Sequence, residues 1–232
     1  MKKAIFNWSS GKDSALALYK VKQEKKFFIG TLLTTVNEKY NRVSMHGVRK
    51  ELLFKQAEML NIPLDILEVP SVTTMDNYDK LMFKKTEFLK EQGYTHSIFG
   101  DIFLNDLRKY REEKLALVGI KGVFPIWKQN TKEIIKEFMS LGFKAITVSI
   151  DAKVLDKSFV GRVINESFLN DLPKGVDPCG ENGEFHTFVY DGPIFDAPIH
   201  FKLGEKVLRS HKGKDGKEKW NTEFWYCDLQ LQ

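Results

Sequence analysis

The feature that most constrains this chain is a turn of hydroxyl, glycine and charged residues close to its start. The turn follows a short apolar run at residues 4–6 and leads directly into the apolar helical pattern of residues 15–19. A strand that ends where a helix begins gathers unpaired backbone N–H groups and the positive end of the helix dipole at one point, where phosphate oxygens are favoured. The residues of the turn are Ser9, Ser10, Gly11, Lys12, Asp13 and Ser14.

Two common phosphate-binding loops do not fit this turn. A Walker-type loop needs a second, upstream glycine and a Ser or Thr after the lysine, whereas Asp13 follows Lys12. A dinucleotide fingerprint needs three glycines, and only Gly11 is present. An ordinary capped helix start explains one polar residue, but not six in this order.

The turn is similar to the Ser-Gly-Gly-Lys-Asp-Ser loop of the PP-loop ATP pyrophosphatases, with Ser10 in place of one glycine. Those enzymes hold the pyrophosphate of ATP and cut between its α and β phosphates. The resemblance therefore implies that residues 9–14 bind ATP.

Length and composition indicate a globular α/β protein. With 232 residues, 42% hydrophobic and 29% charged, the chain can form one large domain or one domain with a smaller lobe. The Lys2-Lys3 start is followed by only a short apolar stretch, so we expect a cytoplasmic protein without a signal peptide or membrane span. Two distant cysteines predict neither a disulfide framework nor a zinc site.

The net charge of +5 is a modest excess, concentrated in local lysine clusters. Such clusters are typical of solvated faces, so we expect no nucleic-acid partner.

Strand-like and helix-like segments alternate through the first two thirds of the chain. This alternation predicts a doubly wound parallel sheet, in which ligands bind beyond the carboxyl ends of the strands. Residues 9–14, residues 37–46 and the pair Gly100-Asp101 all fall at such ends. The expected strands are residues 4–6, 27–36, 64–69, 95–99 and 145–150, and the expected helices are residues 13–23, 48–60, 76–92, 105–118 and 131–141.

Beyond residue 151 the pattern changes to a short helix, a turn-rich stretch and then strands. We therefore expect an ATP-binding α/β domain over residues 1–150 and a smaller α+β lobe over residues 151–232. The expected elements of the lobe are a helix at 160–169, strands at 185–190, 199–203, 206–210 and 220–229, and a hairpin turn at 213–216.

The second informative stretch, residues 181–187, reads Glu-Asn-Gly-Glu-Phe-His-Thr. Two carboxylates, an amide and an imidazole on a glycine-bearing loop can bind a polar substrate or assist proton transfer. From spacing alone, a solvated turn is an equally good interpretation.

Residues 181–187 resemble the Glu-Gly-Gly-Glu-Phe/Tyr-Glu-Thr motif of the diphthine ammonia ligase family, PP-loop proteins that amidate diphthine to diphthamide. Further resemblances follow in the family's order. Ser44-Met45-His46 resembles the family's Met-x-His region, and Gly100-Asp101-Ile102 resembles its Gly-Asp/Ala-Ile turn. Arg111 with Glu113 resembles its Arg-Val-Glu helix. Pro125-Ile126-Trp127 resembles its Pro-Leu-Trp, and residues 191–195 resemble its Asp-Gly/x-Pro-x-Phe.

The family resemblance implies a reaction and a set of site residues. The substrate carboxylate would attack ATP to give an acyl adenylate and pyrophosphate, and ammonia, taken from free ammonium, would then displace AMP. The substrate would be diphthine on elongation factor 2; whether the chain forms a homodimer is left open. The implied catalytic residues are Lys12, Asp13, Glu181, Glu184 and His186, the implied ATP-binding residues are 9–14, His46, Gly100, Asp101 and Arg111, and the implied Mg²⁺ ligands are Asp13 and Asp101.

Two of these assignments have ordinary alternatives. His46 could cap a helix start, and Arg111 could belong to a solvated helix face together with neighbouring glutamates.

Two departures from the family motif bear on the substrate. Asn182 replaces a glycine, and His186 replaces a glutamate with a group that titrates near neutral pH. The variant resembles a bacterial subgroup associated with corrinoid salvage, so the same chemistry on a corrinoid-related acid is an alternative. A tRNA-thiolating PP-loop enzyme is disfavoured because no Cys-x-x-Cys pair exists, and a nucleotide sensor because it would not need residues 181–187.

Overall fold

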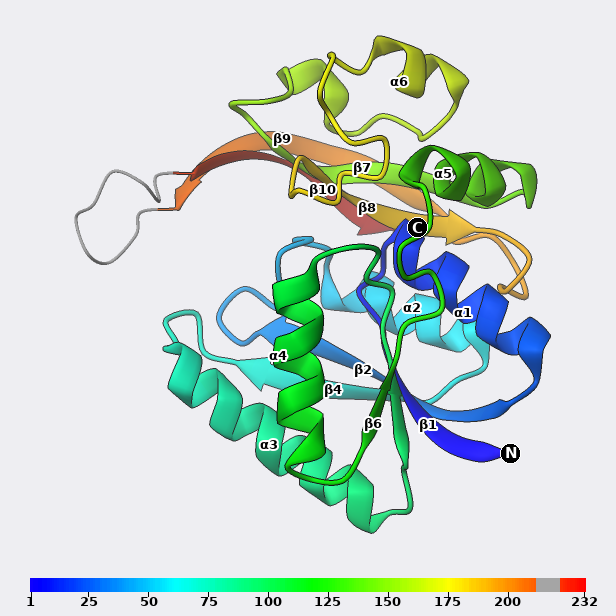
Figure 1. Cartoon of the computed structure of the whole chain (residues 1–232). Helices are drawn as coiled ribbons and strands as arrows, with labels where there is room; N and C mark the ends of the chain where they lie inside the picture. The colour runs from blue at the N-terminus through cyan, green and yellow to red at the C-terminus, as the bar shows by residue number, and fades with distance from the viewer. Residues whose placement is uncertain (212–221) are drawn as a thin grey trace.

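The structure, a computed structural model, describes residues 1–211 and 222–232 and contains two β-sheets (Figure 1). The first sheet is the expected parallel one, with strand order β4-β2-β1-β5-β6. A two-residue strand, β3 (Arg42–Val43), pairs antiparallel with β2 at its edge. The parallel strands are β1 (Lys2–Asn7), β2 (Phe27–Asn37), β4 (Leu64–Val69), β5 (His96–Ile98) and β6 (Lys121–Val123).

The strand order changes direction between β1 and β5. The chain passes from β1 outward through β2 to β4, and then returns to place β5 and β6 on the other side of β1. Such a switch point leaves a crevice at the carboxyl ends of the two central strands. The turn at residues 9–14 follows β1 and Gly100-Asp101 follows β5, so both lie at the crevice.

The second sheet is antiparallel, with strand order β8-β7-β10-β9. Its strands are β7 (Lys144–Asp151), β8 (Phe185–Asp191), β9 (Phe201–His211) and β10 (Thr222–Leu231). The two expected strands at 199–203 and 206–210 are one continuous strand, β9. The expected hairpin turn at 213–216 lies outside the described residues.

The prediction that residues 145–150 form the fifth parallel strand is wrong. This strand is β7, which belongs to the second sheet, and the fifth parallel strand is β6, which the sequence analysis missed. Six consecutive residues of β7 are buried, so its apolar run does not distinguish a parallel from an antiparallel partner. Strand β6 has only three residues and includes Gly122, too few to show a period. The division at residue 150 stays a prediction.

Helices α1 (Lys12–Glu24) and α2 (Lys50–Leu60) lie between the two sheets, as Figure 1 shows. Helix α1 is therefore covered on both sides, and residues 14–18 are all buried. Helices α3 (Met75–Glu91) and α4 (Asn105–Ala116) cover the other face of the parallel sheet. The short 3₁₀ helix η1 (Lys157–Phe159) and helices α5 (Thr131–Ser140) and α6 (Glu166–Asp171) lie beyond the second sheet.

This layered arrangement brings the second sheet down onto the start of α1. Among the described helices, none has both the length and the apolar character needed to cross a bilayer.

Candidate active site

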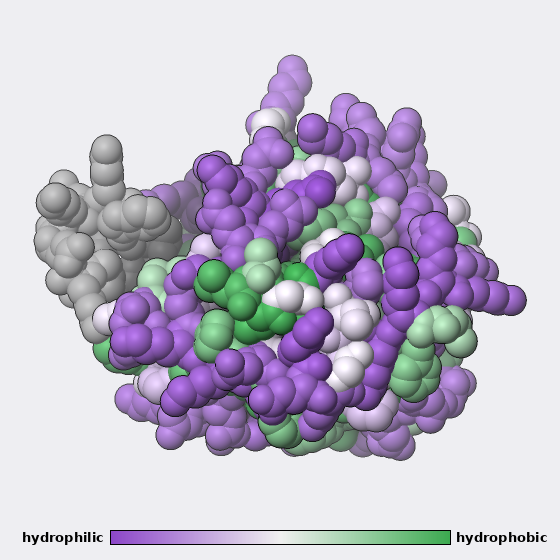
Figure 2. All heavy atoms as spheres, turned by 60° about the horizontal axis from the view of Figure 1, so that its bottom comes forward, coloured by the Kyte–Doolittle hydropathy of each residue, from purple (hydrophilic) through white to green (hydrophobic). Residues whose placement is uncertain are grey.

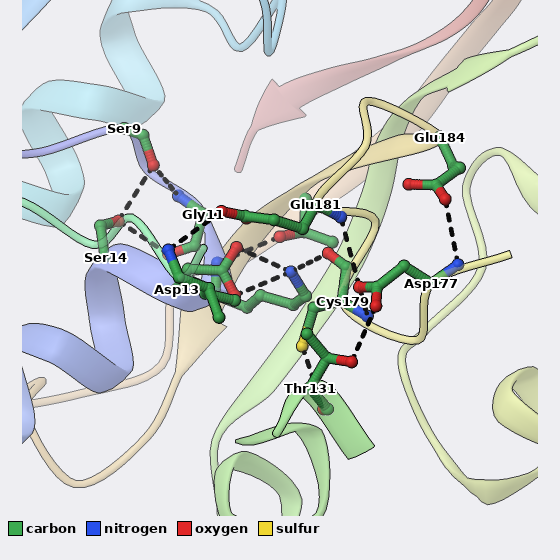
Figure 3. Close-up of polar contacts among 12 residues, drawn as sticks. Ser9, Gly11, Asp13, Ser14, Thr131, Asp177, Cys179, Glu181 and Glu184 are labelled. Carbon is green, nitrogen blue, oxygen red and sulfur yellow. Dashed lines mark hydrogen bonds and ion pairs between the residues drawn. The ribbon is translucent and has the colours of Figure 1, made fainter. Parts of the chain in front are cut away.

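The turn after β1 is held by its own hydroxyl groups. The Ser9 hydroxyl donates to Ser14 Oγ over 3.1 Å and accepts from the Gly11 N–H over 3.3 Å, and Ser14 Oγ donates to the Gly11 carbonyl over 2.8 Å (Figure 3). Ser10 adopts a left-handed backbone with φ of 70°, the conformation that glycine adopts most easily. Helix α1 then begins at Lys12, and its N-cap residue, Gly11, has no side chain that could accept from the first turn.

Two glycines allow other elements to approach the start of α1 closely. A Cβ atom on Gly11 would lie 2.7 Å from His46 Cε1 and 3.3 Å from the Thr187 carbonyl oxygen. A Cβ atom on Gly100 would lie 2.8 Å from the Ser14 backbone nitrogen. The loop after β5 and strand β8 therefore lie in direct contact with the turn and the start of α1.

The ammonium of Lys12 is buried at the centre of the site. It donates to both carboxylate oxygens of Asp13, over 2.9 and 2.7 Å, and to the backbone carbonyl of Cys179. Burial opposes the charge, but Asp13, together with Cys179 and Glu181, holds the pKa of Lys12 above its ordinary value. Lys12 is therefore charged, and its bond to the Cys179 carbonyl brings it against the loop at residues 177–184.

Glu181 and Glu184 belong to the same loop but face different ways (Figure 3). Glu181 accepts a hydrogen bond from the Ile102 N–H over 2.9 Å and lines the cavity. Burial, then the nearby charge of Asp13, raises the pKa of Glu181 to about 7. Glu184 does not line the cavity.

Glu184 instead holds the loop together from within. Its carboxylate accepts from the Asp177 N–H over 3.0 Å, and from the backbone and side-chain amides of Asn182 over 2.9 and 3.0 Å. This placement favours a role for Glu184 in positioning Glu181 over direct contact with a substrate.

His46 and His186 form a ring pair at the wall of the cavity, with centroids 4.8 Å apart and planes tilted by 34°. His46 Nδ1 donates to the Thr187 carbonyl over 3.0 Å, so that its Nε2 is left as an acceptor. Burial lowers the pKa of His46 to about 4 and that of His186 to about 3. The expectation that His186 titrates near neutral pH is therefore wrong, because protein atoms surround its half-buried ring and the charges of His46 and Lys12 disfavour a further positive charge.

Asp101 and Arg111 form an ion pair at the other end of the cavity, with Arg111 Nε 2.8 Å from Asp101 Oδ2. The Arg111 guanidinium also lies over the Phe99 ring, 4.4 Å from its centroid. Burial raises the pKa of Asp101, and Arg111 opposes this shift. Arg111 thus belongs to the cavity wall.

These residues surround a cavity of about 580 Å³, within the range of small-molecule sites. Ser10, Gly11 and Glu184 do not line it. The expected site residues that do line it are Ser9, Lys12, Asp13, Ser14, His46, Gly100, Asp101, Arg111, Glu181 and His186.

The cavity fits a nucleoside triphosphate, because the backbone N–H groups at the start of α1 and the buried Lys12 ammonium favour phosphate oxygens. Asp13 and Asp101 are oxygen ligands of the kind that Mg²⁺ takes together with phosphates. Within residues 1–211 and 222–232, no three acidic, His or Cys side chains are grouped to hold a metal by themselves. A metal ion here would need phosphate oxygens to complete its coordination.

Sequence reasoning missed two residues that build the site. Thr187 Oγ1 accepts from the Lys12 N–H over 3.0 Å and ties β8 to the start of α1. Gln56, fully buried in α2, bonds to the turn and to β8. A signal for Gln56 was present, since it lies four residues after Leu52 and four before Leu60 on an apolar helix face.

Comparison with known proteins finds two matching domain families. Residues 1–122 match the diphthamide synthase N-terminal domain, and residues 130–230 match the diphthamide synthase C-terminal domain. Together the two matches cover nearly all of the chain, and the break between them precedes α5.

Curated relatives carry a single name, diphthine–ammonia ligase. The human protein is 25% identical over 184 residues, which is 74% of this chain and 68% of the human one. The rat protein is 26% identical over 152 residues, 62% of this chain and 57% of its own. The fission yeast protein is 29% identical over 170 residues, or 67% of this chain but only 28% of its own length.

Proposed function

Because the chain belongs to the diphthamide synthase family, we propose that it is an ATP-dependent ligase that joins ammonia to a carboxylic acid in diphthamide synthesis. The relatives' name points to diphthine, carried by elongation factor 2, as the acid and to ammonia as the nitrogen donor. The observation that carries the proposal is the position of Lys12. Its buried ammonium lies where the switch point of the parallel sheet meets the acidic loop of the second sheet.

The proposed reaction has two steps. A carboxylate oxygen of the substrate attacks the α-phosphorus of ATP, the bond to the bridging oxygen breaks, and pyrophosphate leaves with the electron pair. The nitrogen lone pair of ammonia then attacks the carbon of the resulting acyl adenylate, AMP leaves, and the nitrogen loses a proton.

The residues of the cavity suit these steps without forming a covalent bond to the substrate. Lys12 and the backbone N–H groups at the start of α1 can stabilise the charge that develops on pyrophosphate. Asp13 and Asp101 can hold Mg²⁺ with the phosphates. Glu181, whose pKa is raised to about 7, can accept the proton that the nitrogen loses at neutral pH.

The test is release of pyrophosphate from ATP, Mg²⁺ and ammonium, with diphthine-bearing elongation factor 2 in one reaction and a corrinoid acid in another. Each reaction is repeated with Lys12→Ala. The matched control is Lys20→Ala, which removes a lysine from the same helix whose ammonium pairs with Glu137 instead.

We expect release that requires elongation factor 2 and falls about a hundredfold or more in Lys12→Ala, as when one charge-stabilising donor is lost. Lys20→Ala should keep the wild-type rate. Release without any acid would identify a hydrolase, and binding of ATP without release would identify a sensor; either outcome would overturn the proposal. Release only with the corrinoid acid would keep the chemistry and change the substrate.

A further inference from the structure

Helices α3 and α4 enclose a second cavity, of about 300 Å³, which we call the α3–α4 cleft. Figure 2 shows hydrophobic surface gathered among hydrophilic side chains on the face of the molecule that carries these helices. Rings of Tyr78, Phe83 and Tyr110 line the cleft, and Phe83 and Leu117 at its edge are 37% and 69% exposed. Exposed apolar surface around a hollow is typical of a site that binds a partner.

The charged side chains of the cleft leave a positive surplus at one lysine. Three of its four bases have an acidic partner within 4 Å: Lys114 pairs with Asp79 of the cleft itself, and Lys80 and Arg111 pair with acids outside it. Among the described residues, Lys84 has no such partner, although its neighbour Lys85 pairs with Asp65. The exposed edge of the cleft therefore combines the Phe83 ring with an unpaired cation, and favours an occupant that carries negative charge beside an apolar group.

The cleft and the active-site cavity are neighbours. The side chains of Tyr78, Met82 and Arg111 contribute to the walls of both. A protein that is anchored in the cleft therefore lies beside the active site, where a protein that presents an acid to ATP has to lie. In a symmetric dimer formed through this face, the unpaired lysines of the two copies would meet, so charge disfavours a second copy as the occupant.

We propose that the α3–α4 cleft is a docking site for the protein that carries the acid, and that it takes an apolar side chain from an acidic segment of that protein. The apolar side chain packs against the rings of the cleft, and a neighbouring carboxylate pairs with Lys84. This inference rests on the proposed function and adds the surface on which the protein substrate docks.

The test is titration calorimetry with elongation factor 2, with and without diphthine, together with the kinetics of pyrophosphate release. Phe83→Ala removes a ring from the edge of the cleft. Phe54→Ala is the matched control, because Phe54 is 50% exposed on α2, on the other face of the parallel sheet. Lys84→Glu reverses the unpaired charge, and its control is Lys136→Glu on the exposed side of α5. Binding of α,β-methylene-ATP is measured on every variant as a check of folding.

We expect Phe83→Ala to weaken binding of elongation factor 2 roughly fivefold or more, the loss expected for part of a ring contact. Phe54→Ala should bind it as the wild type does. The factor without diphthine should show the same dependence on Phe83, because the cleft does not hold the reacting acid. In the kinetics, Phe83→Ala should raise the KM for elongation factor 2 and leave kcat unchanged, as when a contact is made equally before and during the reaction.

Lys84→Glu should weaken binding of elongation factor 2 several-fold at about 50 mM salt and much less at about 500 mM, because salt screens exposed charges. Lys136→Glu makes the same change of net charge and should bind as the wild type does. Affinity for α,β-methylene-ATP should be the same in all of these proteins.

The inference is overturned if elongation factor 2 does not bind the wild type, if Phe83→Ala and Phe54→Ala weaken binding equally, or if Lys84→Glu and Lys136→Glu bind alike. Analytical ultracentrifugation of the protein by itself tests the second copy. A dimer that dissociates in Phe83→Ala would place another copy of the chain in the cleft and would also overturn the inference.

Failure of the proposed function has a different signature from failure of the docking site. If the function is wrong, elongation factor 2 supports no pyrophosphate release that depends on Lys12, whatever residue stands at position 83. If only the docking site is wrong, release depends on Lys12 and on elongation factor 2, but the KM for the factor is the same in Phe83→Ala as in the wild type.

Discussion

The indole N–H of Trp8, at the end of β1, donates to the side-chain oxygen of Gln56 in α2 over 2.9 Å, and both residues are almost completely buried. The amide nitrogen of Gln56 donates to the Ser10 carbonyl over 3.1 Å and to the Val189 carbonyl of β8 over 2.7 Å. One side chain thus joins the turn at residues 9–14, helix α2 and the second sheet.

Replacing Gln56 with leucine should destabilise the protein strongly. The substitution keeps the volume but leaves the Trp8 N–H and one bond each to the Ser10 and Val189 carbonyls without a partner in a buried place. The expected loss is about 2–4 kcal/mol of the free energy of unfolding, measured by urea denaturation. Glu58→Gln on the exposed side of the same helix should change it by less than about 0.5 kcal/mol. A small change in the free energy of unfolding in Gln56→Leu would show that water takes over the hydrogen bonds of the lost amide.

Replacing Ser10 with glycine should stabilise the protein. Ser10 has a positive φ of 70°, and its buried hydroxyl has no hydrogen-bond partner among the described residues. Glycine relieves both costs and adds some entropy to the unfolded chain, for a net gain of about 1 kcal/mol. The midpoint of urea denaturation measures the gain. Ser9→Gly is the control and should destabilise, because the Ser9 hydroxyl holds the turn. A lower midpoint of urea denaturation in Ser10→Gly would contradict the prediction that the backbone of Ser10 is strained.

Asp228 of β10 should make the protein sensitive to acid. Burial alone would raise its pKa, but hydrogen bonds from Arg49 and Arg42, each as short as 2.7 Å, lower it to about 2. The stabilisation is complete above the ordinary Asp pKa near 4 and is lost as the pH falls through about 2. After solvent screening we expect about 1 kcal/mol.

The measurement for Asp228 is the free energy of unfolding at pH 5 and at pH 2.5, in the wild type and in Asp228→Asn. Between pH 5 and pH 2.5 the free energy of unfolding should fall more in the wild type than in Asp228→Asn. Asp171→Asn, which removes an exposed partner of Arg162, should behave as the wild type does. Equal losses in wild type and Asp228→Asn would argue against the prediction.

The His46–His186 pair should make stability fall as the pH drops from 7 to 5. The folded pKa values of about 4 and 3 lie below the ordinary value near 6.5, and the positive charge of Lys12 adds to the shift. Between pH 7 and pH 5 these histidines are therefore protonated in the unfolded chain but not in the folded protein. This lowers the free energy of unfolding by roughly 1.5 kcal/mol per histidine. His186→Asn should remove about half of this pH dependence in urea denaturation. An unchanged dependence would show that the pair is solvated.

Local patterns predicted the elements that carry the site better than the way those elements are assembled. The turn at residues 9–14, α1 and β4 could be located because strand, turn and helix signals follow one another without interruption. The sheet to which β7 belongs could not be predicted. A strand that is buried on both faces has the same apolar sequence whether its neighbours are parallel or antiparallel. Short strands such as β6 form because of tertiary packing, and they contain too few residues to show the alternation of apolar and polar residues that identifies a strand.

The same limit applies to individual side chains of the site. Sequence distinguished Lys12 and Glu181 by their motifs, but could not tell that Glu184, three residues after Glu181, turns back into its own loop. The low pKa of His186 comes first from burial and then from His46, 140 residues earlier, whose ring only folding brings within 4.8 Å.

The contacts of Lys12 imply that binding of the proposed nucleotide is an exchange of partners. An incoming phosphate must replace Asp13 and the Cys179 carbonyl at the ammonium, and the displaced carboxylate must then find another cation. A nucleotide that carries a divalent cation would satisfy both groups at once, whereas inorganic phosphate alone would leave the half-buried Asp13 carboxylate without a counter-ion. The proposed site would thus discriminate against phosphate that carries no cation, although no residue is dedicated to that task.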